Sequence, residues 1–152
     1  MRLRITGNSG CSSRHRGLPS AAMTISQRVQ LVVTGLSAVL VLIMALIAGR
    51  STTLFGTWDI VVHGGIGNLV FVLAVVAALL SFTSEAPGRV VIGAMAFMLL
   101  SFVQIGLGYV GRDTLEAAAW HIPNGVLLMG IVTFQFAALL SMRDAADVDP
   151  AS

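Results

Sequence analysis

Four long apolar stretches dominate the chain, and short polar segments separate them. The apolar stretches cover residues 29–49, 60–83, 90–111 and 117–142. A helix rises about 1.5 Å per residue, so each stretch is long enough to cross the roughly 30 Å hydrocarbon core of a bilayer. The pattern therefore predicts an all-α fold, a polytopic membrane four-helix bundle formed by residues 29–142.

Polar residues flank this predicted domain on both sides. Residues 1–28 contain five arginines together with several glycines and serines, and we expect them to be a disordered tail. Met23 opens a stretch with the character of a natural start, which leaves open that residues 1–22 come from a mis-called start codon. Residues 143–152 form an acidic C-terminal tail that we also expect to be disordered.

The amino-acid composition is that of a membrane protein, and it excludes some kinds of metal site. Charged residues make up 11% of the chain, whereas a soluble domain has about 25%. The single cysteine, Cys11, excludes an intramolecular disulfide and a cysteine-based metal cluster. All nine basic residues are arginine, a bias that points to a GC-rich bacterial genome. We therefore expect the lipid bilayer of a bacterial inner (cytoplasmic) membrane as the protein's surroundings, and no nucleic-acid partner.

The distribution of arginine predicts an orientation. Four spans place both termini on one side of the membrane. That side would hold seven of the nine basic residues, and the other side would hold Arg50 and Arg112. Because cytoplasmic segments are enriched in arginine and lysine, the pattern favours an N-in, C-in topology. Without residues 1–22 the bias becomes weak.

The two halves of the chain resemble each other. The pair Gly49-Arg50 matches Gly111-Arg112, and residues 77–81 and 137–141 both read AALLS. This similarity suggests a duplicated helical hairpin. Chance is an equal alternative, because small residues are common in membrane helices.

Two histidines inside the spans are the candidates for chemistry. His63 and His121 lie near the starts of the second and fourth apolar stretches, at nearly the same distance from the polar segments that follow. Alternate helices of a four-helix bundle can face each other across its centre. Ionisable residues are costly in a bilayer and usually functional. We therefore expect the two imidazoles to meet at one depth below the outer face.

Glycine follows each histidine by one helical turn, as Gly67 and Gly125. Missing side chains beside two imidazoles leave space for a flat ring system. Two neutral imidazoles on opposite sides of an iron would hold a six-coordinate haem b, with His63 and His121 as metal ligands. At the outer ends of the odd-numbered spans, two arginines are the expected partners for the haem propionates. They are Arg50 and Arg112.

A structural interpretation of these residues stays open. Glycines on membrane helices also let helices approach closely, and a histidine near a span end also bonds to another helix or reaches water. Interhelical hydrogen bonds are favoured for Gln104, Asn68 and Asn124, and the alternative for Gln104 is a hydrogen-bond donor to a ligand residue or a contact to a quinone. Asp59 is interpreted as a helix N-terminal acid rather than as a partner that orients His63.

Residues 103–128, VQIGLGYVGRDTLEAAAWHIPNGVLL, carry a resemblance to a known family. Together with the histidine on the second span, this segment resembles one four-helix half of the haem A synthase-type membrane proteins, over roughly residues 30–141. The resemblance implies that His63 and His121 are haem ligands. The chain has one such half, and Gly64 stands where the family typically has arginine. The chain is also similar to small four-span membrane proteins of actinobacteria, which implies no activity.

The leading hypothesis is a membrane haem protein for electron transfer or haem handling, acting as a homodimer or with a membrane redox partner. The alternative is a structural or partner-subunit role without a cofactor. A small transporter is less favoured, because the inner half of the spans offers little polar lining beyond Gln135. No catalytic residue is identified, and enzymatic activity is left open.

Overall fold

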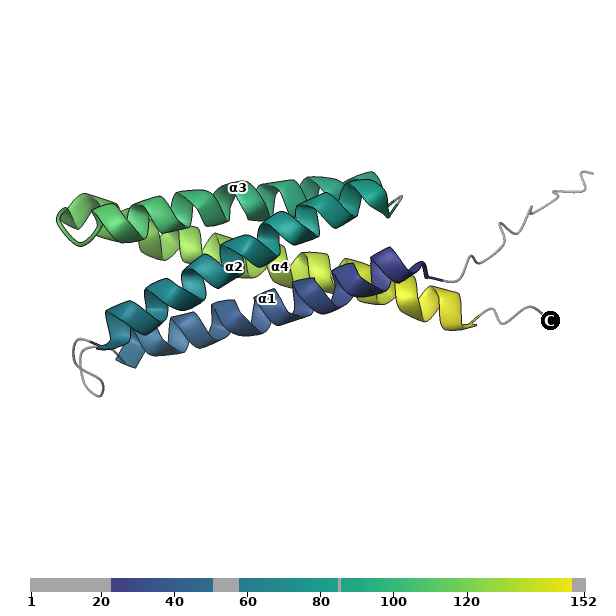
Figure 1. Ribbon diagram of the computed structural model, residues 1–152, viewed down its shortest axis with the longest axis horizontal. Coiled ribbons are helices and arrows are strands. Elements are labelled where there is room, and N and C mark those ends of the chain that lie inside the picture. Colours follow the sequence, from purple (N-terminus) through teal and green to yellow (C-terminus); the bar gives the residue numbers. More distant parts are fainter. Residues whose placement is uncertain (1–22, 51–57, 85, 149–152) are drawn as a thin grey trace, which may run out of the picture.

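The computed structural model describes residues 23–50, 58–84 and 86–148, which form four α-helices (Figure 1). The helices are α1 (Ile25–Arg50), α2 (Trp58–Thr83), α3 (Gly88–Val110) and α4 (Leu115–Val148). All four are long and apolar enough to cross a membrane. Over the described residues, the prediction of an all-helical bundle whose four helices are long and apolar enough to cross a membrane is therefore confirmed. Cys11, His15 and the rest of residues 1–22 lie outside the described residues.

Helix boundaries differ from the expected ones at both ends of the chain. α1 begins at Ile25 because Thr24 and Gln27 form a capping box. The Gln27 amide N–H donates to Oγ1 of Thr24 (3.2 Å), and the Thr24 N–H donates to Oε1 of Gln27 (2.9 Å). At the other end, α4 continues to Val148. Residues 25–28 and 143–148 are thus helical, which corrects their assignment to disordered tails.

The helices pack as two hairpins, α1–α2 and α3–α4. Each helix contacts two neighbours, in the pairs α1–α2, α2–α3, α3–α4 and α1–α4. The remaining two pairs, α1 with α3 and α2 with α4, are diagonal: the two helices of each pair lie on opposite sides of the bundle's centre. The hairpins lie close together at the end where the described chain begins and ends, and they diverge at the opposite end, on the left of Figure 1. We call that opposite end the histidine end, because His63 and His121 lie there.

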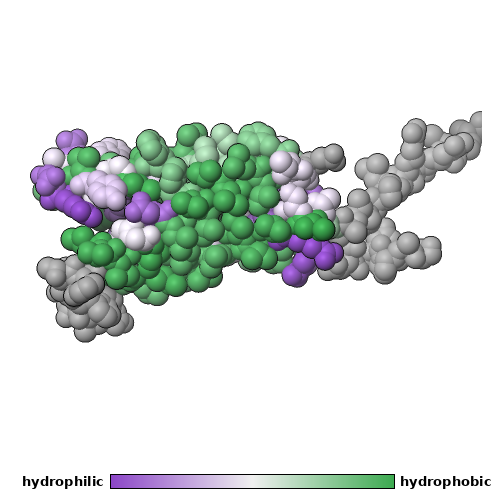
Figure 2. Space-filling model, in the orientation of Figure 1, coloured by the Kyte–Doolittle hydropathy of each residue, from purple (hydrophilic) through white to green (hydrophobic). Residues whose placement is uncertain are grey.

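The outward surface of the bundle is apolar. On the face drawn in Figure 2, apolar residues cover the middle of the molecule and polar residues gather toward both ends. Large apolar side chains on all four helices contribute to this surface, and Val32, Leu79, Ile92 and Val126 are each more than 60% exposed. A surface of this kind suits lipid rather than water. The chain is therefore a multi-pass membrane protein by helix length, composition and surface.

An apolar core separates two polar regions inside the bundle. The core consists of Val70, Ala74, Phe97, Leu128 and Val132. Small residues such as Ala74 let the helices approach closely, and packing then contributes through van der Waals contacts. This core forms the floor on which the cleft at the histidine end is built.

Buried amides lie on the other side of the core, toward the termini. Gln30 is fully buried and accepts a hydrogen bond at Oε1 from the Ser84 hydroxyl (3.2 Å). Its Nε2 donates to the Ala77 carbonyl (3.4 Å). Gln135 donates from Nε2 to the Val90 carbonyl (3.4 Å). These bonds join α1 to α2 and α3 to α4, which matches the role of polar side chains between membrane helices.

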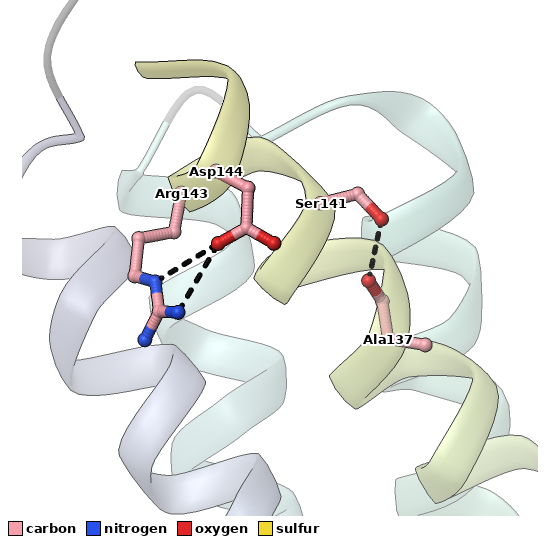
Figure 3. A network of polar contacts seen from close by, with 4 residues as sticks. All are labelled: Ala137, Ser141, Arg143 and Asp144. Atoms are coloured by element: carbon pink, nitrogen blue, oxygen red, sulfur yellow. Dashed lines mark hydrogen bonds and ion pairs between the residues drawn. The ribbon is translucent and has the colours of Figure 1, made fainter. Parts of the chain in front are cut away.

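The last turns of α4 show where this helix becomes polar (Figure 3). The Ser141 hydroxyl donates to the Ala137 carbonyl (2.9 Å), so the helix satisfies this polar group internally. Arg143 forms an ion pair with Asp144 (3.1 Å), and both side chains are more than half exposed. Charged residues therefore begin at Arg143, close to the expected end of the span.

Candidate functional site

A large cleft opens where the two hairpins diverge. Its volume is about 1010 Å³, at the upper end of the roughly 300–1,000 Å³ of typical ligand sites. Side chains from all four helices line it, and most of them are apolar. Val70 and Leu128 of the apolar core lie at its base. The cleft is therefore a largely apolar, half-open cavity at one end of the bundle.

His63 of α2 and His121 of α4 come together in this cleft from diagonally opposite helices. Their ring centroids are 6.0 Å apart, and the ring planes are inclined by 54°. Both residues are partly buried, and the Nδ1 atoms of both rings are buried without a hydrogen-bond partner. A buried polar atom without a partner is costly. The structure thus brings together the two histidines that the sequence singles out and leaves each with an unpaired nitrogen.

Gln104 of α3 holds His121 from one side. Its Nε2 lies 3.1 Å from Nε2 of the His121 ring and donates to the His121 carbonyl (3.0 Å). Asn124 in turn donates from Nδ2 to Oε1 of Gln104 (2.6 Å) and to the Leu100 carbonyl (3.1 Å). The expected interhelical hydrogen bonds of Gln104 and Asn124 are confirmed. The contact between Gln104 and the imidazole adds a direct link to the candidate site.

Gly67 and Gly125 both line the cleft, as the sequence predicts for space beside the histidines. A Cβ at Gly67 would lie 3.2 Å from the terminal methyl carbon of Met44, and a Cβ at Gly125 would lie 3.2 Å from Nε2 of Gln104. The absence of a side chain at Gly67 therefore leaves space for the Met44 side chain at the edge of the cleft. The absence of a side chain at Gly125 leaves space for the Gln104 amide. A further glycine was missed: a Cβ at Gly108 would lie 3.1 Å from Cε1 of His121.

Arg112 lies at the mouth of the cleft and lines it. Its guanidinium carbon is 5.1 Å from the centre of the Tyr109 ring, within range of a cation–π contact. One terminal nitrogen is 3.9 Å from the place where a Cβ at Gly64 would be, so the side chain reaches toward α2. Tyr109 also accepts from the Asn68 amide (3.5 Å). The side chains of Arg50 and Asp59 lie outside the described residues.

The donor set limits which metal chemistry suits the site. Across the residues that the structure describes, no three histidine, cysteine or acidic side chains come together. A protein zinc site needs three or four such ligands, and two imidazoles supply only two. Two trans imidazoles do suit a metal whose remaining four positions come from a macrocycle. Comparisons with protein-family models, with curated proteins and with solved structures found no match.

Proposed function

We propose that this protein binds one haem b in the cleft, with His63 and His121 as its two axial ligands, and serves electron transfer or haem handling. The 6.0 Å separation of the two ring centroids carries the proposal. A metal–imidazole bond is about 2.0 Å long, so two trans imidazoles place their ring centres roughly 6 Å apart. The observed spacing is close to this value, which supports the proposal.

The surroundings of the two imidazoles support the same group. Gly67 leaves the cleft wall without a side chain close to His63, and the apolar lining suits a hydrophobic ring. Arg112 brings a positive charge to the mouth, where a propionate can accept charge-assisted hydrogen bonds. A haem held in this way supplies reversible one-electron chemistry. The protein's own part is to hold two imidazoles, exclude water with apolar side chains and bind an anionic edge at Arg112.

The orientation in the membrane is part of the proposal. The arginine distribution supports an N-in, C-in topology in a bacterial inner membrane, with the histidine end toward the outer face. On this orientation the cleft opens near the outer surface, within reach of an extracytoplasmic or membrane-bound redox partner. A homodimer would bring two such clefts together and restore the two-half arrangement of the family that the sequence resembles.

A visible spectrum of the purified protein tests the proposal. Protein expressed in haem-replete cells and purified in detergent is expected to carry one haem per chain. It should show a Soret band and, after reduction, sharp α and β bands typical of six-coordinate haem. A colourless preparation that takes up no added haem would contradict the proposal. That result would favour a structural or partner-subunit role without a cofactor.

A further inference from the structure

The geometry points to Gln104 as a positioning residue that caps the metal-binding nitrogen of His121 in the metal-free protein. The side-chain amide of Gln104 donates to Nε2 of the ring and so occupies the lone pair that iron would take. This inference rests on the proposed function for the identity of the ligand. The hydrogen-bonding state that it assigns to His121 can be measured without any haem.

The hydrogen bonds around Gln104 fix which end of its amide faces the imidazole. Nε2 of Gln104 donates to the His121 carbonyl (3.0 Å), and a carbonyl can only accept. Oε1 of Gln104 accepts from the Asn124 amide, which is itself oriented by its bond to the Leu100 carbonyl. If the Gln104 amide were inverted, oxygen would face oxygen at His121 and nitrogen would face nitrogen at Asn124. The N–H therefore points at the ring.

The protonation of His121 follows from this orientation. With an N–H donated to its Nε2 at 3.1 Å, the neutral ring must carry its own proton on Nδ1. Nδ1 lies against α3, 3.6 Å from where a Cβ at Gly108 would be, and it is buried without a hydrogen-bond partner. Many metal-bound histidines have this tautomer, in which Nε2 carries the lone pair. His121 thus keeps its lone pair on Nε2, where the Gln104 amide occupies it.

The two axial positions are consequently not equivalent. No side-chain hydrogen bond to His63 is found among the described residues, and its ring is approached by the main chain of Met44. His63 is therefore available for iron at once, whereas His121 becomes available only after the Gln104 amide moves aside. Haem binding through His121 would therefore depend on Gln104, whereas binding through His63 would not.

Nitrogen NMR of haem-free protein labelled with ¹⁵N-histidine tests the cap. His121 is expected to be protonated at Nδ1 and to accept a hydrogen bond at Nε2. In Gln104→Ala the Nε2 signal should move toward that of a free lone pair. Gln104→Glu, which offers only an acceptor, should transfer the ring proton to Nε2.

A wild-type ring protonated at Nε2, or a His121 signal that neither substitution changes, would overturn the inference. Failure of the protein to bind haem would contradict the proposed function and leave this result intact.

The rate of haem binding tests the consequence of the cap. Loss of one hydrogen bond should let Gln104→Ala form the six-coordinate spectrum roughly fivefold faster than wild type in stopped-flow mixing. Gln135→Ala is the matched control, because Gln135 is a buried glutamine on the far side of the apolar core and does not line the cleft. Its rate should equal that of wild type. Equal rates for Gln104→Ala and Gln135→Ala would overturn the capping role.

Discussion

Alanine in place of either His63 or His121 is expected to abolish the six-coordinate haem spectrum. Each substitution removes one of the two nitrogen donors that the structure brings within 6.0 Å, and no third histidine, cysteine or acidic residue joins them in the described part of the chain. Loss of an outer-shell partner of a metal ligand typically weakens binding by about 10–100-fold. Loss of the ligand itself should exceed that range. The measurement is haem retained per chain after gel filtration, together with the reduced spectrum.

His15→Ala is the matched control, because it removes the chain's third histidine, which precedes the four spans in the sequence. It should keep the wild-type spectrum and haem content. An unchanged spectrum in either His63→Ala or His121→Ala would show that the haem, if bound, uses other ligands. Thermal stability of the haem-free variants distinguishes loss of a ligand from loss of the fold, since alanine is well tolerated in a helix.

Leucine at Gly67 is expected to exclude haem from the cleft without removing a ligand. Gly67 lies one turn from His63 and lines the cleft, and even a Cβ there would come within 3.2 Å of the Met44 side chain. A leucine side chain would therefore occupy part of the cleft or push the Met44 side chain into it, because Gly67 and Met44 both line the cleft. We expect haem content to fall to a small fraction of the wild-type value, measured by the Soret absorbance per chain.

Gly65→Leu provides the comparison for this substitution. Gly65 is two residues away on the same helix, is exposed, does not line the cleft and would meet nothing within 4 Å of an added Cβ. The two variants have the same change in helix propensity and apolar volume, so they differ only in the direction of the side chain. Equal haem content in Gly67→Leu and Gly65→Leu would show that the cleft does not hold the ring.

The four spans could be predicted from the sequence because length and lack of charge decide whether a segment crosses a bilayer. The meeting of His63 and His121 followed from their similar depth on alternate helices. Helix ends were less predictable, since Thr24 and Gln27 extend α1 through a local capping box that hydropathy does not register. The duplicated hairpin and the N-in, C-in topology stay predictions.

Other features of the site depend on tertiary packing that the sequence does not encode locally. The Gln104 side chain could face lipid, another helix or the cleft, and its bond to His121 depends on how α3 and α4 pack at Gly125 and Gly108. The divergence of the two hairpins, which creates the cleft, likewise arises from contacts between helices rather than from one span. The three closely spaced glycines at positions 106, 108 and 111, just before Arg112, were the available signal for Gly108, but glycine is frequent in membrane helices.

The central claim is that two imidazoles of one chain bind a single iron from opposite sides. Electron–nuclear double resonance on oxidised protein labelled with ¹⁵N-histidine measures this directly, because it detects the histidine nitrogens bound to the iron. The account predicts two strongly coupled histidine nitrogens in a low-spin ferric signal, and the loss of one of them in His121→Ala. Protein that incorporates no haem, or a ferric signal with one or no coupled histidine nitrogen in the wild type, would contradict it.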